Sequence, residues 1–100
     1  MKKNLNKEKF LKSELGSSMK ECITAWDKSL TELRKLGMVN SEDYKRERKA
    51  ADWCQAQWEV YQIALRQLFG VTYHFTRTDE YFGVVTEDEM DWMFKVERAG

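Results

Sequence analysis

Proline is absent from this 100-residue chain, and glycine occurs only five times. Because proline breaks helices and glycine weakens them, their scarcity favours long helices and excludes proline-rich linkers. No apolar run approaches the roughly 18 residues of a membrane-spanning helix. Lys2 and Lys3 are not followed by an apolar stretch, so we expect no signal peptide. These features predict a single cytoplasmic domain over residues 1–100.

Side chains suited to catalysis are also scarce. His74 is the only histidine, and Cys22 and Cys54 lie far from it and from each other in sequence. Zinc sites need four ligands, commonly in closely spaced pairs, and catalytic cysteine or serine needs a base beside it. The acidic run 87–91 lacks the central glycine of a calcium loop. We therefore predict that the protein is not an enzyme, holds no metal and needs no cofactor.

Neither sign of charge is in excess, since 17 basic residues balance 17 acidic ones. This balance excludes a uniformly basic protein that coats nucleic acid. The two halves differ, however: residues 1–50 carry 13 basic and 8 acidic side chains, whereas residues 51–100 carry 4 and 9. Six of the nine acids fall between Asp79 and Asp91. The sequence thus predicts a basic part and an acidic part, either of which can meet a partner.

Apolar spacing in the first third of the chain predicts a helix over 19–36. Its stripe recurs at intervals of three and four residues and consists of Met19, Cys22, Ile23, Trp26, Leu30, Leu33 and Leu36. Before it, a segment from Leu5 to Leu15 has helical spacing as well. Gly16-Ser17-Ser18 separates the two segments, and Ser18 with Glu21 fits a capping box, so the second helix is expected to begin there. Whether Gly16 breaks or bends the path is left open. Gly37 is suited to the helix end.

The next segment predicts a long helix over 41–69, capped by Asn40 or Ser41 and ended by Gly70. One stripe on it comprises Tyr44, Ala51, Cys54, Trp58, Tyr61, Leu65 and Leu68, and a second comprises Ala50, Trp53, Gln57, Val60 and Ala64. We expect the first stripe to face helix 19–36 and the second to face a sheet. An antiparallel hairpin of the two helices places Cys22 opposite Cys54, as two buried, reduced thiols without a bond.

After Gly70 the apolar period changes from 3.6 to 2, which predicts strands over 71–76, 81–86 and 92–97. A helix is the alternative for the last segment, because Thr86 and Glu89 also fit a capping box. His74 is expected on the solvated side of its strand. The predicted fold class is α+β: an antiparallel helical hairpin with one long helix (helical part about 5–69) and a small C-terminal antiparallel β-sheet (about 71–97).

Aromatic residues make up 13% of the chain, and Trp53 and three aromatics of the C-terminal part are not accounted for by the main stripes. Large aromatics at a surface often anchor protein interfaces. With the neighbouring acids they predict a partner-binding surface made of Asp79, Glu80, Tyr81, Phe82, Glu87, Asp88, Glu89 and Trp92. The basic run Lys45–Lys49 spreads around a helix and has acidic neighbours, so we interpret it as a solvated turn.

Residues 75–86 and 91–98 resemble the end of small accessory proteins carried on bacterial mobile elements, phages among them. Such elements also carry anti-CRISPR proteins, to which this chain is similar in size and in its lack of catalytic machinery. The resemblance implies a small non-enzymatic inhibitor or adaptor that binds a bacterial protein complex, in its most specific form a Cas nuclease. The alternative is a nucleic-acid-binding accessory protein that uses Lys2, Lys3, Lys7, Lys9, Lys12 and the run Lys45–Lys49.

Overall fold

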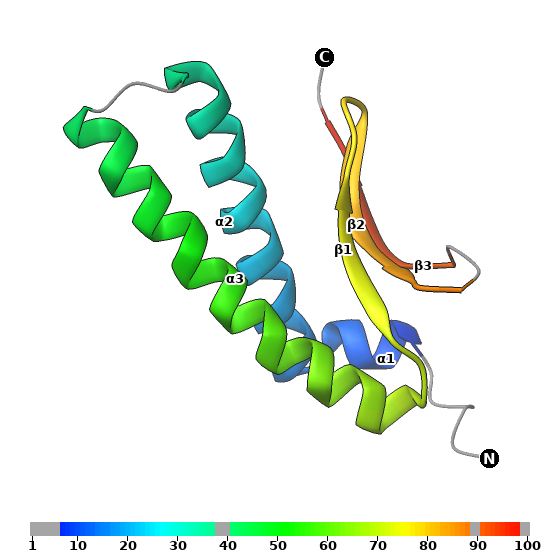
Figure 1. The fold of residues 1–100 in the computed structure, drawn as a ribbon. Coiled ribbons are helices and arrows are strands. Elements are labelled where there is room, and N and C mark those ends of the chain that lie inside the picture. Colours follow the sequence, from blue (N-terminus) through cyan, green and yellow to red (C-terminus); the bar gives the residue numbers. More distant parts are fainter. Residues whose placement is uncertain (1–6, 38–40, 89–90, 99–100) are drawn as a thin grey trace.

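The computed structural model describes residues 7–37, 41–88 and 91–98. In this part of the chain, helices precede strands. The elements are α1 (Lys7–Lys12), α2 (Glu14–Leu36), α3 (Glu42–Phe69), β1 (Tyr73–Arg77), β2 (Tyr81–Thr86) and β3 (Trp92–Glu97). The strands form an antiparallel sheet in the order β1-β2-β3 (Figure 1). The predicted α+β class, with its helical hairpin and C-terminal sheet, is confirmed, and the last segment is a strand and not a helix.

Helix α2 begins earlier than the sequence predicted. Its N-cap is Ser13, whose side chain accepts a hydrogen bond from the Gly16 amide at 3.1 Å. A Cβ atom on Gly16 would lie 2.1 Å from the carbonyl oxygen of Phe10, so only glycine allows α1 to fold back onto α2. The expected helix start at Ser18, with its capping box, is therefore wrong. Gly16 is a contact point between two helices and not a helix end.

Helix α3 has the ends that the sequence predicted. The Ser41 side chain caps it by accepting from the Tyr44 amide at 3.1 Å, and Gly70 ends it in the left-handed conformation, with φ 77°. Gly37 likewise follows α2 with a positive φ of 73°. The alternative cap, Asn40, lies outside the described residues.

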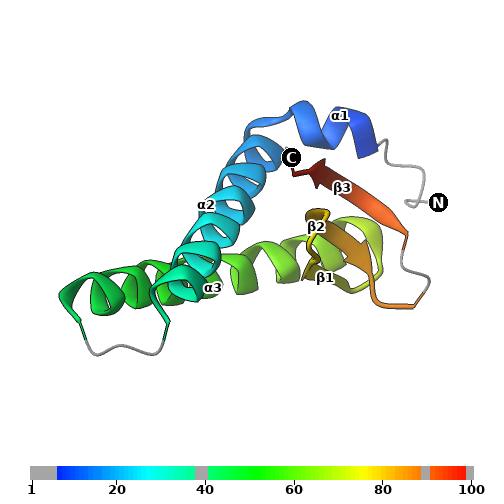
Figure 2. The same ribbon diagram turned by 90° about the horizontal axis from the view of Figure 1, so that it is seen from above.

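The sheet packs against α2 and the C-terminal end of α3 (Figures 1 and 2). Trp26 of α2 stacks on Phe75 of β1 with ring centroids 4.3 Å apart. The buried core combines residues of all these elements: Met19, Ile23, Trp58, Leu65, Phe69, Tyr73, Phe82, Val84 and Met93. Large apolar side chains of the hairpin and of the sheet thus share one core.

The second apolar stripe of α3 is not covered by the sheet, which corrects the sequence-based expectation. Trp53 and Val60 are 68% and 66% exposed, and neighbouring Ile63 is 50% exposed. The reason is the short link between Phe69 and Tyr73, after which β1 turns back along α2. The sheet buries its apolar side there and leaves the opposite side of α3 uncovered by any described element.

The two cysteines confirm the predicted register of the hairpin. The Cys22 thiol donates a hydrogen bond to the carbonyl oxygen of Cys54 across the α2–α3 contact, at 3.4 Å. Both thiols are free; Cys54 is buried, whereas Cys22 is only partly buried, so the expectation of full burial fails for one of them.

We expect both thiols to be unreactive in the folded protein. Burial, and then the neighbouring Cys54, raise the pKa of Cys22 to about 11, and burial raises the pKa of Cys54 as well. At pH 7.5 this leaves about 0.03% of Cys22 as the reactive thiolate. Ellman's reagent should therefore label the native protein at least 100-fold more slowly, as a rough bound, than the protein in guanidinium chloride. Labelling at equal rates would contradict the packing of α2 on α3.

Candidate functional site

The predicted aromatic residues Tyr81 and Trp92 form a half-buried pair on the sheet. Their rings meet edge to face with centroids 5.1 Å apart. The Lys95 ammonium lies 4.9 Å from the Tyr81 ring centroid and 5.4 Å from that of Trp92. The pair is thus partly satisfied within the protein, by ring contact and by cation–π attraction.

Phe82 does not belong to a binding surface. It is buried with Val84 in the core, on the side of β2 that faces the helices. The sequence prediction that Phe82 contacts a partner is therefore wrong. Alternation along a strand puts Phe82 on the opposite face from Tyr81, and a two-residue aromatic run cannot expose both rings to one partner.

The predicted acidic residues fall into two groups at opposite ends of β2 (Figure 1). Asp79 and Glu80 are exposed in the turn before the strand, and Glu87 and Asp88 are exposed after it. A six-residue strand spans about 20 Å, so these groups do not form one patch. His74, exposed as expected, has its Nε2 atom 3.5 Å from Glu87. Glu89 lies outside the described residues.

The basic run at the start of α3 is exposed and locally paired, as its spacing indicated. Arg46 pairs with Asp43, and Arg48 lies 3.4 Å from Asp52. Exposed pairs of this kind contribute little to stability. They leave the guanidinium groups accessible to other anions.

A buried ion cluster, which the sequence analysis missed, joins α2 to the sheet. Asp27 is only 6% exposed, and its carboxylate accepts two hydrogen bonds from Arg98, at 2.6 and 2.8 Å, and one from Arg77 Nε at 2.9 Å. Arg77 also donates to the Thr31 hydroxyl at 2.9 Å. The only available sequence signal was a charged residue beside Trp26 of an apolar stripe.

The charges of this cluster do not cancel. One carboxylate faces two guanidinium groups, so one positive charge is left over. Burial alone would raise the pKa of Asp27, but hydrogen bonds from Arg98 and Arg77, together with their charges, hold it below its usual value of 3.8. The same hydrogen bond raises the pKa of Arg98. All three groups are therefore charged at neutral pH.

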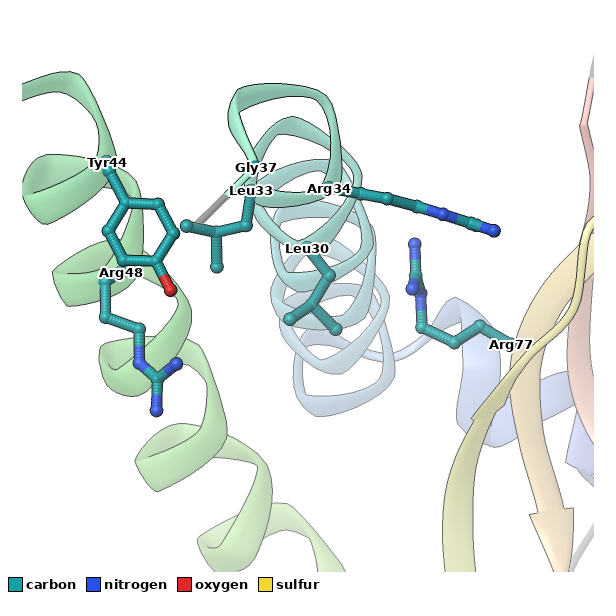
Figure 3. A pocket seen from close by; sticks show the side chains of 7 residues that line it. All are labelled: Leu30, Leu33, Arg34, Gly37, Tyr44, Arg48 and Arg77. Carbon is teal, nitrogen blue, oxygen red and sulfur yellow. The ribbon is translucent and has the colours of Figure 1, made fainter. Parts of the chain in front are cut away.

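A cleft of about 470 Å³ opens beside this cluster, where α2, α3 and β1 meet (Figure 3). It is lined by Leu30, Leu33, Arg34, Gly37, Tyr44, Arg48 and Arg77. Figure 3 shows the two leucines between Tyr44 and Arg48 on one side and the guanidinium ends of Arg34 and Arg77 on the other. An apolar floor with a cationic rim can hold an anion that also carries an apolar group.

The outer face of α3 is the second surface without a described partner. Trp53, Val60 and Ile63 follow one another at spacings of seven and three residues, which places them on one side of the helix. Lys45 and Lys49 precede Trp53 on the same side. The face is thus apolar over its C-terminal part and basic at its N-terminal end.

Other kinds of site are not seen in the described ranges. No group of three or more histidine, cysteine, aspartate or glutamate side chains in residues 7–37, 41–88 and 91–98 could hold a metal ion. Within the same ranges, no helix is long and apolar enough to cross a membrane. A scan of protein-family models, a search of curated proteins and a search of solved structures each found no match to the chain.

Proposed function

We propose that the protein is a non-enzymatic inhibitor or adaptor that binds a bacterial protein complex in the cytoplasm through the outer face of α3. The observation that carries this proposal is the exposed Trp53, in line with Val60 and Ile63. Soluble proteins seldom leave several large apolar side chains together at the surface unless a partner covers them. Tryptophan is also the residue that most often dominates binding energy at protein interfaces.

The charge on this face describes the partner. Because Lys45 and Lys49 continue the stripe beyond Trp53, the complementary surface has an apolar recess for the indole and carboxylates at one end. The acidic and aromatic surface predicted from the sequence has less support. Phe82 is buried, and the acids are divided between the two ends of β2.

In its most specific form, the proposal is that the bound complex is a Cas nuclease and that binding inhibits cleavage. The sequence resemblance to small proteins of mobile elements supports this form, and the two free thiols suit the reducing cytoplasm. Inhibition by steric occupation needs no catalytic group, which fits a chain whose only histidine is exposed at the sheet.

Replacing Trp53 and Val60 together by alanine should abolish the interaction while leaving the fold intact. Both side chains are largely exposed, so their loss creates no cavity, whereas loss of an interface anchor costs about 2 kcal/mol or more, roughly a 30-fold change in affinity. The measurement is affinity capture with tagged wild-type and variant protein from bacterial lysate, followed by cleavage assays with purified Cas nucleases. Circular dichroism checks folding.

The matched control is Leu15→Ala, which removes an apolar side chain that is also exposed but lies on α2. This variant should capture and inhibit as the wild type does. Equal capture by the Trp53 and Val60 variant would contradict the proposal. Capture of nucleic acid, with affinity falling steeply as salt rises, would favour the nucleic-acid-binding alternative.

A further inference from the structure

We infer that the cleft between α2, α3 and β1 binds an acidic peptide segment of a partner protein, one that carries a large apolar side chain between carboxylates. The cleft is separate from the face that holds Trp53. Arg48 and Tyr44 point about 140° and 180° away from Trp53 around the helix axis. The inference therefore stands independently of the proposed function.

Three guanidinium groups from three elements provide the charge that selects an anion. Arg34 comes from α2, Arg48 from α3 and Arg77 from β1. Arg77 is held in place by its hydrogen bonds to Asp27 and Thr31, which use Nε and Nη2. Within residues 7–37, 41–88 and 91–98, its other terminal nitrogen, Nη1, donates to no protein group. A ligand carboxylate can therefore bind a preorganised arginine here.

The acids near the rim do not neutralise it. Asp79 lies 3.7 Å from Arg34, and Asp52 lies 3.4 Å from Arg48, and all four side chains are well exposed. Such pairs are weak, so a ligand carboxylate can displace or join them at little cost. Asp27 is shared by two arginines and adds one uncompensated positive charge behind the cleft.

The floor of the cleft selects an apolar group. Leu30 and Leu33 lie between the arginines, and the Tyr44 ring forms one wall (Figure 3). A smaller hollow of about 170 Å³ shares these leucines and Arg48 and extends along the helix seam to Trp26 and Ala51. From Leu33 to Trp26 the helix rises about 10 Å, the length of three extended residues.

This shape favours a peptide over a simpler anion. Inorganic phosphate or a nucleic-acid backbone would pair with the arginines but would leave the leucine floor against a polar ligand. A peptide with an apolar residue between Asp or Glu residues satisfies both parts of the cleft. Paired recognition of this kind, by an arginine cluster and an apolar pocket, is common in peptide-binding proteins.

A phage-displayed library of random dodecapeptides tests the inference, because it samples many acidic and non-acidic sequences at once. Selection on the wild-type protein, with counter-selection on the Arg34→Gln, Arg48→Gln double variant, should enrich Asp and Glu on both sides of a large apolar residue. Both arginines are exposed, so circular dichroism of the variant should equal that of the wild type. No enrichment, or enrichment of non-acidic peptides, would overturn the inference.

Fluorescence anisotropy with the synthetic consensus peptide supplies the quantitative test. The double variant should bind it at least about tenfold more weakly, whereas Arg46→Gln, an exposed arginine of α3 outside the cleft, should bind it as the wild type does. Serine in place of the apolar residue should also weaken binding at least about tenfold. Equal binding by the double variant, or no effect of serine, would refute the proposed site.

Two further measurements separate this site from the other possibilities. Trp53→Ala should leave peptide binding unchanged, so that failure of the proposed function and failure of this inference are distinguishable. An oligothymidylate that displaces the peptide at equal concentration would assign the cleft to nucleic acid and overturn the inference. No displacement supports it.

Discussion

Asp27→Asn should lower the free energy of unfolding by about 3 kcal/mol or more. Asparagine keeps the size of the side chain but removes the charge that holds Arg77 and Arg98, and removing one partner of a buried ion cluster typically costs about 3–5 kcal/mol. For a domain of this size the midpoint of thermal unfolding should fall by more than about 10 °C. Urea denaturation at pH 7, followed by circular dichroism, measures the effect.

Asp52→Asn is the matched control, because Asp52 is exposed and its pair with Arg48 is loose. That substitution should change the free energy of unfolding by less than about 0.5 kcal/mol. If Asp27→Asn were equally mild, Asp27 would not connect α2 to the sheet.

The effect of Asp27 should also depend on pH in a defined direction. Its pKa is lowered in the folded protein, because the hydrogen bonds and charges of Arg98 and Arg77 outweigh the burial that alone would raise it. A carboxyl group with a lowered pKa stabilises the fold above its unfolded pKa, and this stabilisation is lost as pH falls through the folded pKa. The difference between wild type and Asp27→Asn should therefore be constant above about pH 5 and shrink below about pH 4. A difference that grows on acidification would contradict the assignment.

Gly83→Ala should destabilise the protein by about 3 kcal/mol, the upper end of the usual cost of overpacking. A Cβ atom at this position of β2 would lie 1.9 Å from the Phe94 carbonyl oxygen and 2.9 Å from the Lys95 Cα atom. Both are backbone atoms of β3, so no side-chain rotation relieves the clash. Strand β3 must move, and with it the buried Met93 and the arginine that follows the strand. Chemical denaturation and the dispersion of amide NMR signals report the loss.

Thr76→Ala provides the comparison, since Thr76 pairs with Gly83 from the other side, on β1. Alanine fits there without a clash, and the expected loss is below about 1 kcal/mol. A Gly83→Ala variant as stable as the wild type would mean that β3 does not approach β2 so closely.

The local structure of this protein was predictable because its signals are local. Ser41 and Gly70 mark the ends of α3 through hydrogen bonds within one turn and through the backbone freedom of glycine. The change of apolar period after Gly70 predicted the sheet, and the short hairpin connection predicted that Cys22 faces Cys54. Each of these inferences depends on residues near in sequence or on one fixed register.

What only the tertiary structure decided depends on the path of the chain between distant segments. Asp27 meets Arg77 and Arg98 across separations of 50 and 71 residues, and no spacing rule links positions so far apart. The expected helix start after Gly16 is wrong because this glycine lets α1 approach α2, a role that involves a neighbouring helix and not its own. The stripe with Trp53 has the same period whether a sheet covers it or not. Periodicity tells which face of a helix is apolar, but only the packing of the whole chain determines which apolar face remains for a partner.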